Sequence, residues 1–381
     1  MKKLITLGLL LAAASANAVT YNLHLLNNQG GESTAYAMND NGMVVGQSYN
    51  STTSQMESTV WNSKTASAQS LGVTGIARGI NNSGVVVGET GSASLIIPNG
   101  YAYSWTSSGG ITNLGTLGGN YSGAYDINES GAITGFAWPT GAAFSTFGQG
   151  FIYKNGVMTP LGTVSSPTGY SRGHGINNSD EIVGRGSVVN FNDSDKYAIY
   201  WDENQNLDQF DIPESGTYST TEQINNNGLI VGASRTPTTG NTLHAVSWDT
   251  DGNINFLNNP NGSSFGSKMW SVNDAGIMVG YDQVISGNIV TDATTTRAII
   301  SYDGVNIIDL NSIVDLTGTG MVALSEAYDV NANGDIVGTA YDAAGNRHAV
   351  YLAAVPIPAA VWLFASGLGL LGWLRRRQTA L

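Results

Sequence analysis

The segment AYDINESGAITG, residues 124–135, contains the pattern on which the fold prediction rests. A short β-prone stretch ends at Asn128, a polar turn follows, and a second β-prone stretch leads to Gly135. Asn and Gly readily adopt the positive φ angles that tight turns need. The segment is therefore predicted to form a β-hairpin, with Asn128 as a turn residue whose side chain bonds nearby backbone rather than a ligand.

The same pattern occurs seven times along the chain, and the copies are called here the first to the seventh repeat. The shared asparagine stands at Asn39, Asn81, Asn128, Asn177, Asn225, Asn273 and Asn331. Successive copies are 42, 47, 49, 48, 48 and 58 residues apart. A repeat of this length indicates one supersecondary unit that buries its apolar face against its neighbours.

Each repeat also contains a second predicted hairpin. Its first strand is seen in YAYSW from Tyr101 and YAIYW from Tyr197. The second strand of the first hairpin, as in VVVG at 85–88, is nearly all apolar, which predicts that both of its faces are covered. Four strands in about 40–50 residues are typical of a propeller blade. The fold class predicted is therefore all-β, a seven-bladed β-propeller of four-stranded blades.

The two ends of the repeat array complement each other. The seventh repeat stops at HAVYLAA, 348–354, and lacks a fourth strand, whereas an unassigned strand, TYNLHLLN, precedes the first repeat at 20–27. We expect the N-terminal strand to pair beside His348–Leu352. This pairing would close the ring and protect an open sheet edge.

The N-terminus has the features of an export signal. Lys2 and Lys3 precede the apolar run 4–14, and Ala16-Asn17-Ala18 fits a signal peptidase site. Residues 1–18 are therefore predicted to be a signal peptide, with Val19 as the mature N-terminus. The chain has no Cys, so the exported fold is expected to have no disulfides.

The C-terminus is predicted to be a transmembrane helix. Residues 355–374 contain no charge, which is about the length that spans a bilayer. The basic cluster Arg375, Arg376 and Arg377 follows at once and favours a cytoplasmic C-terminus with the body outside. The predicted domains are the signal peptide 1–18, the propeller 19–353 and the tail 354–381.

The tail resembles the PEP-CTERM sorting signal of Gram-negative bacteria. The Pro motif contains Val355, Pro356 and Pro358, and the apolar run and the Arg cluster follow it. Ile357 stands where the commonest form has Glu, so the V-P-x-P-A variant is the better match. The resemblance implies processing by an exosortase-type enzyme, a place in the cell envelope, at the cell surface or in the extracellular matrix, and association with exopolysaccharide.

The repeats resemble the extracellular HAF repeat, which is named for a His-Ala-Phe triplet. His244-Ala245-Val246 and His348-Ala349-Val350 are the nearest copies, with Val in place of Phe. The resemblance covers roughly residues 33–353, and the INxxGxVVG pattern is its more specific half. It implies an exported bacterial repeat protein and supports the predicted location and fold.

The charge balance argues against nucleic acid as a partner. Of 15 Lys and Arg residues, five lie in the two end segments, which leaves ten basic against 28 acidic residues in the body. Only 11% of the 381 residues are charged. An acidic body repels phosphate backbones, so no nucleic-acid partner is expected.

The sequence lacks the common catalytic and metal-binding motifs. The four His residues do not form an HExxH pattern, and neither a GxSxG elbow nor a GxxxxGK loop is present. Asp126 and Asp329 occupy equivalent repeat positions and are interpreted as rim or channel-lining residues. The prediction is therefore a protein that is not an enzyme and has no metal site and no cofactor.

Two acidic segments resemble calcium loops only partly. In Asp249–Asn253 the Gly comes fourth and no bidentate Glu follows, so a tight hairpin turn is the better interpretation. The segment 192–195 is interpreted first as a solvated loop, with a weak Ca²⁺ or sugar contact as the alternative.

Long inserts are the predicted ligand-binding elements. They span Phe136–Gln149, Arg185–Lys196 and Tyr281–Thr296, and in a closed ring they would rise on one face. The candidate ligand-binding residues in them are Trp138, Phe144, Phe147, Phe191, Asp193 and Asp195. Exposed aromatic rings beside polar groups suit saccharides. The alternative is that these rings pack against their own loops.

Together these features predict an exported, non-catalytic surface or matrix protein. It would bind exopolysaccharide or serve a structural or adhesive role in biofilm. The alternatives are a polysaccharide-acting enzyme, hydrolase or lyase, that uses carboxylates on the loop face, and a protein-interaction scaffold in the envelope.

Overall fold

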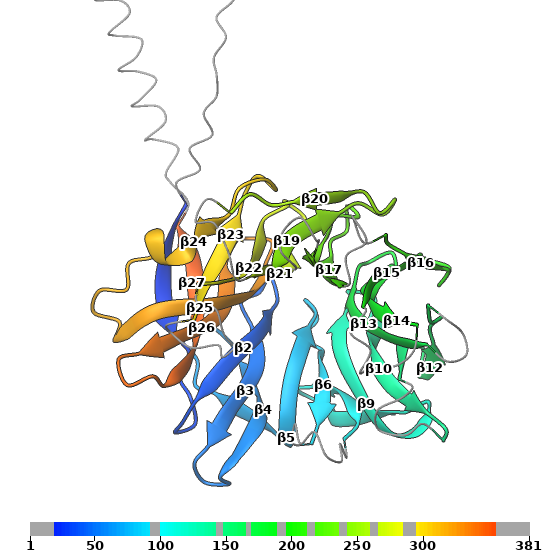
Figure 1. Cartoon of the computed structure of the whole chain (residues 1–381). Coiled ribbons are helices and arrows are strands. Elements are labelled where there is room, and N and C mark those ends of the chain that lie inside the picture. Colours follow the sequence, from blue (N-terminus) through cyan, green and yellow to red (C-terminus); the bar gives the residue numbers. More distant parts are fainter. Residues whose placement is uncertain are drawn as a thin grey trace, which may run out of the picture.

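The computed structural model has an all-β, propeller-like fold in which the sheets stand around a common axis (Figure 1). It describes residues 19–91, 100–141, 148–164, 169–188, 196–211, 218–235, 242–259, 266–284 and 295–355. The predicted all-β class and propeller-like architecture are confirmed at this level.

Within these residues, one sheet has seven strands and five have four. The seven-stranded sheet contains β2 (Ser33–Met38), β3 (Val44–Asn50), β4 (Gln55–Trp61), β5 (Gln69–Ile80), β6 (Val86–Thr90), β7 (Ala102–Thr106) and β8 (Gly110–Gly115). The next two are β9 (Gly118–Ile127), β10 (Ile133–Pro139), β11 (Gln149–Lys154) and β12 (Val157–Pro160), then β13 (Tyr170–Ile176), β14 (Ile182–Ser187), β15 (Tyr197–Trp201) and β16 (Leu207–Gln209).

The remaining three sheets complete the ring. They are β17 (Ser219–Ile224), β18 (Ile230–Arg235), β19 (Leu243–Trp248) and β20 (Ile254–Phe256), then β21 (Ser267–Val272), β22 (Met278–Gln283), β23 (Thr296–Ser301) and β24 (Ile308–Asp309), and last β25 (Met321–Val330), β26 (Ile336–Asp342), β27 (Arg347–Val355) and β1 (Thr20–Leu25). A short 3-10 helix, η3 (Leu310–Ser312), follows β24.

The seven-stranded sheet consists of two four-stranded units that share β5. The first half of β5, up to Thr74, pairs with β4, and the second half, from Gly75, pairs with β6. Gly75 has φ +150°, and a Cβ there would lie 2.1 Å from the Glu89 carbonyl oxygen. The chain thus passes from the outer strand of one unit to the inner strand of the next without a loop.

The N-terminal strand closes the last sheet, as the sequence predicts. β1 pairs antiparallel with β27, with Leu23 opposite Leu352 and Thr20 opposite Val355. The side chains of the first repeat also pack against the seventh, because Met38 and Trp61 share a core cluster with Val337 and other residues of β26 and β27. The array of sheets is therefore closed through strand pairing and through side-chain packing.

The shared asparagines form a closed circuit of hydrogen bonds. Each donates from its side-chain nitrogen to the backbone carbonyl of the next, at 2.8–3.3 Å, and Asn331 donates to the carbonyl of Asn39. The side-chain oxygen of Asn225 accepts the backbone N–H groups of Asn227 and Leu229, at 3.0 and 2.9 Å. The predicted turn role is confirmed, and the same side chain also joins neighbouring units.

The predicted export and sorting segments lie outside the described residues. They include Ala16 and Ala18 of the signal peptidase site and, in the tail, Pro356, Pro358 and Arg375, Arg376 and Arg377, whereas Val355 is the last residue of β27. Among the described residues, no helix is long and apolar enough to cross a membrane.

Replacing one asparagine of the circuit tests its contribution to stability. Asn225→Ala removes one buried and two partly buried hydrogen bonds and leaves polar backbone groups unsatisfied, so the free energy of unfolding should fall by about 2–3 kcal/mol. Chemical denaturation measures this change. Asn204→Ala, in an exposed turn, is the control and should cost less than about 0.5 kcal/mol. Equal losses in the two variants would show that the circuit does not stabilise the fold.

Candidate functional site

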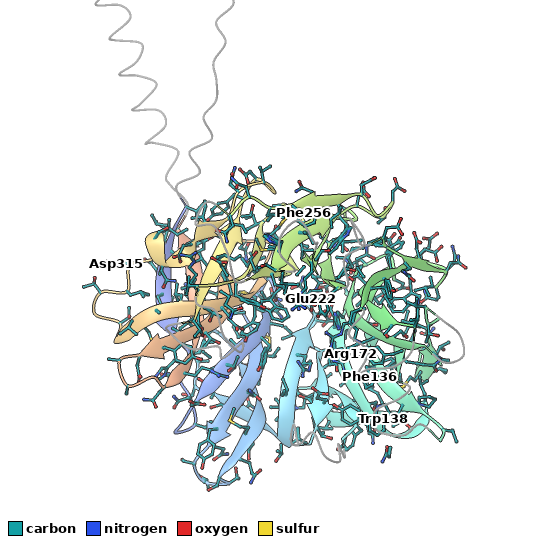
Figure 2. All side chains as sticks on the ribbon, viewed as in Figure 1. Phe136, Trp138, Arg172, Glu222, Phe256 and Asp315 are labelled. Carbon is teal, nitrogen blue, oxygen red and sulfur yellow. The ribbon has the colours of Figure 1, made fainter. Side chains whose placement is uncertain are left out.

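A cavity of about 820 Å³ lies between the inner strands of the units. Its wall includes residues of the first strand of all seven repeats, from Tyr36 in β2 to Tyr328 in β25. Figure 2 shows Glu222 and Arg172 near the middle of the ring, with Phe136 and Trp138 further out. The cavity is the candidate functional site because it gathers polar side chains from segments far apart in the sequence.

A β-bulge places one side chain of each repeat in this cavity. In each first strand the pairing register skips the residue three positions before the shared Asn. The skipped residues, all of which line the cavity, are Tyr36, Arg78, Tyr125, His174, Glu222, Trp270 and Tyr328. A bulge re-aims a side chain that the ladder would otherwise fix. The repeats thus share one backbone device and differ in the group that it presents.

Half of the body's basic residues line the cavity. Of the ten Lys and Arg residues in 19–353, five belong to its wall. They are Arg78, Arg172, Arg185, Arg235 and Lys268. The last four lie toward the end of the inner strands opposite the asparagine circuit, as the pairing of Arg172 with Arg185 shows. This part of the wall is called the arginine end.

Aromatic rings stack on two of the guanidinium groups. The Tyr125 ring lies 4.9 Å from the guanidinium of Arg78 and 5.2 Å from that of Arg172. On its other side Arg172 lies 4.7 Å from the Phe136 ring. Arg78 also pairs with Glu89, with its Nε 2.8 Å from the carboxylate. Stacking and pairing fix both guanidinium planes in the wall.

Arg185 and Arg235 have no carboxylate partner within the described residues. Arg185 donates to the Tyr218 hydroxyl at 3.3 Å, and the Arg235 guanidinium lies 5.2 Å from the Tyr218 ring. The Nε atom of each is buried without a hydrogen-bond partner. Neither guanidinium forms an ion pair within the described residues, although the charge of Arg185 also acts on the Glu222 carboxylate.

A carboxylate, an amine and an imidazole form a second cluster at the arginine end. Lys268 Nζ lies 2.6 Å from Glu222 Oε1, and His174 Nδ1 lies 3.3 Å from Glu222 Oε2. Burial opposes ionisation of Glu222, but Lys268, His174 and Arg185 outweigh it and lower its pKa to about 2. Burial, with Arg185, Arg172 and Lys268, lowers the pKa of His174 to about 3. Glu222 is therefore ionised and His174 neutral at neutral pH.

The sixth, seventh and first repeats bring aromatic rings to the wall. The Trp270 and Tyr328 ring centroids lie 5.9 Å apart, and those of Tyr36 and Tyr328 lie 5.0 Å apart. Trp270 also contacts Tyr281, and its indole Nε1 has no hydrogen-bond partner within the described residues. Lys268 Nζ lies 3.8 Å from the centroid of the Trp270 ring, so the aromatic set adjoins the arginine end.

Asp126 and Asp329 join neighbouring units along the wall, where the sequence places them. Asp126 accepts the backbone N–H of Ile176, at 2.9 Å, and the side chain of Gln223, at 3.1 Å. Asp329 accepts the N–H of Met38 at 2.8 Å and the hydroxyl of Ser271 at 2.6 Å. Both line the cavity, and these bonds make them structural groups.

The predicted role of Trp138 as an exposed loop aromatic is wrong. Trp138 lies in β10, is only 7% exposed and packs in a cluster with Phe136 and Tyr170. The strands that lead into the predicted inserts, β10, β14 and β22, are longer than the repeat pattern indicates and end at Pro139, Ser187 and Gln283. The other candidates, Phe144, Phe147, Phe191, Asp193 and Asp195, lie outside the described residues, as does the segment 192–195.

The predicted turn at 249–253 is confirmed. The side chain of Asp249 accepts the backbone N–H groups of Asp251 and Asn253, at 3.1 and 2.9 Å. Within the part of the chain that the structure describes, no group of three or more His, Asp or Glu residues could hold a metal ion.

Comparison with known proteins gives fold likeness only. No family model and no curated protein matches the chain. A Pyrococcus horikoshii acylaminoacyl peptidase matches 79% of this chain and 49% of its own, at 11% identity and TM-score 0.45. A puromycin hydrolase S511A mutant in complex with PGG matches 84% of this chain and 51% of its own, at 9% identity and TM-score 0.45. Trypanosoma rangeli sialidase matches 88% of this chain and 59% of its own, at 9% identity and TM-score 0.39. The chain thus spans about half the length of the first two.

These neighbours contradict the prediction that the chain is not an enzyme. All three are described as a peptidase, a hydrolase or a sialidase. The non-catalytic interpretation is therefore withdrawn. At this identity and TM-score the likeness assigns no activity to the chain, and the argument for function rests on the cavity.

The Asp126 carboxyl should make stability depend on pH. Burial raises its pKa from the ordinary range of an aspartate to about 7, so the folded state holds a proton that the unfolded state has released. Its contribution is complete at low pH and is lost as pH rises through 7. The wild type should therefore lose about 1–3 kcal/mol of stability between pH 5 and pH 7 that Asp126→Asn does not lose.

Denaturant unfolding of both proteins at several pH values measures this difference. The Asn variant is expected to be less stable overall, because its amide nitrogen cannot accept the bonds that Asp126 accepts. The diagnostic quantity is the slope with pH, and parallel curves for the two proteins would contradict the assignment.

Proposed function

We propose that the arginine end of the cavity binds an acidic saccharide. The observation that carries this proposal is the location of the cations, since five of the ten basic residues of an acidic body line one cavity. Burying cations costs free energy unless they are paired, and Arg185 and Arg235 have no carboxylate partner within the described residues. A carboxylate or sulfate on the ligand would supply that partner.

The aromatic set favours a sugar over a small inorganic anion. Trp270, Tyr328 and Tyr36 form a continuous set of rings that adjoins the arginine end at Lys268. Sugar rings present apolar C–H faces that stack on aromatic side chains, while their polar groups bond to hydrogen-bonding side chains. A ligand with an anionic edge and an apolar face matches both parts of the wall. The cavity volume of about 820 Å³ suits a short oligosaccharide segment.

We also propose the finer architecture and the location. The ring would have seven blades, with β5 contributing to the first and the second. The protein would be exported and held at the cell surface or in the matrix, which the signal-like N-terminus, the PEP-CTERM-like tail and the HAF-like repeats support.

The backbone N–H of Ala354 donates to Asp335 in the turn of the seventh repeat, so Val355 and its partner Thr20 lie toward the asparagine circuit. The arginine end is at the opposite face.

Removal of an unpaired guanidinium tests the anionic part of the proposal. Arg185→Ala should weaken binding of an oligogalacturonate or a hyaluronan oligosaccharide about tenfold or more, because a charged hydrogen bond contributes about 1.5–3 kcal/mol. Titration calorimetry on the full-length protein measures it. Lys154→Ala removes an exposed charge outside the cavity and is the matched control. Equal weakening in both variants, or equal affinity of the wild type for neutral malto-oligosaccharide, would refute the proposal.

Removal of the Trp270 ring tests the aromatic part of the proposal. Trp270→Ala should weaken binding about fivefold or more through lost stacking, while the dependence of affinity on salt stays as in the wild type. Arg185→Ala should flatten that dependence instead. Calorimetry across a salt series separates the two effects, and a W270A variant with unchanged affinity would remove the aromatic set from the site.

A further inference from the structure

Two glutamates of the arginine end stand in opposite electrostatic environments. Glu222 lies in β17 and Glu326 in β25, and the strand that carries Lys268, β21, contacts both. Both carboxyls belong to the cavity wall. They are therefore brought to one site by strands more than 100 residues apart in the sequence.

The partners of the two carboxyls differ. Glu222 receives Lys268 and the Thr220 hydroxyl on one oxygen, at 2.6 and 2.8 Å, and faces His174 on the other. Glu326 is only 4% exposed, and the Tyr328 hydroxyl donates to it. Burial raises the pKa of Glu326, whereas the charges around Glu222 keep its pKa low. One carboxyl is thus held ionised and the other is biased toward the protonated form.

We infer that Glu222 and Glu326 are the base and the acid of a glycoside-cleaving site. In this reaction the Glu326 carboxyl gives its proton to the glycosidic oxygen as the bond from that oxygen to the anomeric carbon breaks. A water molecule adds its oxygen to the anomeric carbon and gives its proton to the Glu222 carboxylate. The products are two shorter saccharides, and proton exchange with water restores both carboxyls. The inference rests on the proposed saccharide binding.

The assignment follows a general rule for carboxyl pairs. A site that cleaves glycosidic bonds needs one protonated and one ionised carboxyl beside the same bond. Environments that push the pKa values of two such groups apart identify the acid and the base. Asp126 and Asp329 differ from this pair, because backbone N–H groups of neighbouring units, those of Ile176 and Met38, donate to them. The partners of Glu222 are instead the side chains of Lys268, Thr220 and His174.

Cleavage should depend on the protonation of Glu326. The groups that face it are Tyr328 on its own strand, Lys268 of β21, Arg347 of β27, Tyr36 of β2 and Tyr281 of β22. Burial raises the pKa of Glu326, whereas the hydrogen bond from Tyr328 and the charges of Arg347 and Lys268 favour the ionised carboxylate. The acid form is lost as pH rises through the raised pKa of Glu326, so activity should fall with rising pH across that pKa.

The experiment measures reducing ends released from oligogalacturonate and from a hyaluronan oligosaccharide by the full-length protein, together with binding by calorimetry. Glu326→Gln should retain binding and lower the release rate by about 10²-fold or more, as expected for loss of a general acid. Glu222→Gln should do the same. Glu57→Gln is the control, because Glu57 is buried and hydrogen-bonded outside the cavity.

The outcomes separate this inference from the proposed function. If the wild type binds neither oligosaccharide, both the proposed function and this inference are wrong. If it binds one but releases no reducing ends over the pH range, or if Glu326→Gln cleaves at the wild-type rate, the inference alone is wrong. A rate that falls with rising pH and drops in both Gln variants but not in Glu57→Gln supports it.

Discussion

The hydrogen bond from each shared asparagine side chain to the backbone of the next repeat is the interaction on which the rest of the structure depends. The same side chain accepts two backbone N–H groups of its own turn, so one residue fixes the hairpin and the position of its neighbour. Because the circuit returns from Asn331 to Asn39, the units cannot tilt independently. The inner strands therefore converge at fixed angles, which is the condition for a shaped cavity between them.

The β-bulge lets one residue of each repeat vary without a change in the pairing of the strands. The residues on both sides of the bulge keep their ladder partners, while the skipped residue contributes nothing to pairing. It can therefore be Glu222 in one repeat and Trp270 in the next without loss of the sheet. A nearly regular ring can thus hold a wall whose side chains differ from repeat to repeat. Neighbouring positions such as Arg185 and Lys268 add further groups to the same wall.

The parts of the fold that were predictable from sequence are those that recur. The turn asparagine and the missing strand of the last sheet follow from comparison of the repeats, and the structure confirms both. The dual use of β5 was not predictable, since it depends on the absence of a loop in a single place. Trp138 was misplaced because the repeat pattern does not fix where β10 ends. The cavity residues were missed because a bulge interrupts the alternation of side chains along a strand, from which the face that each side chain occupies is inferred. The exchange of Tyr, Arg, His, Glu and Trp at one repeat position was the available signal.

The wall of the cavity contains seven Asp and Glu residues and five Lys and Arg residues, and four of the five cations gather at the arginine end. Such a local cluster of cations is compatible with an acidic chain because charges act over short distances. At physiological salt the Debye length is about 8 Å, so exposed carboxylates on the outer strands are screened from a ligand at the axis. Inside the cavity the guanidinium groups are a few ångströms from any anion, and partial burial strengthens their attraction. Under the proposed function, net charge would govern the encounter with a ligand, whereas the local arrangement of Arg185, Arg235 and Lys268 would govern binding. An acidic polymer would then be held only where a segment reaches the arginine end, which would favour chain ends and single strands over broad polyanionic surfaces.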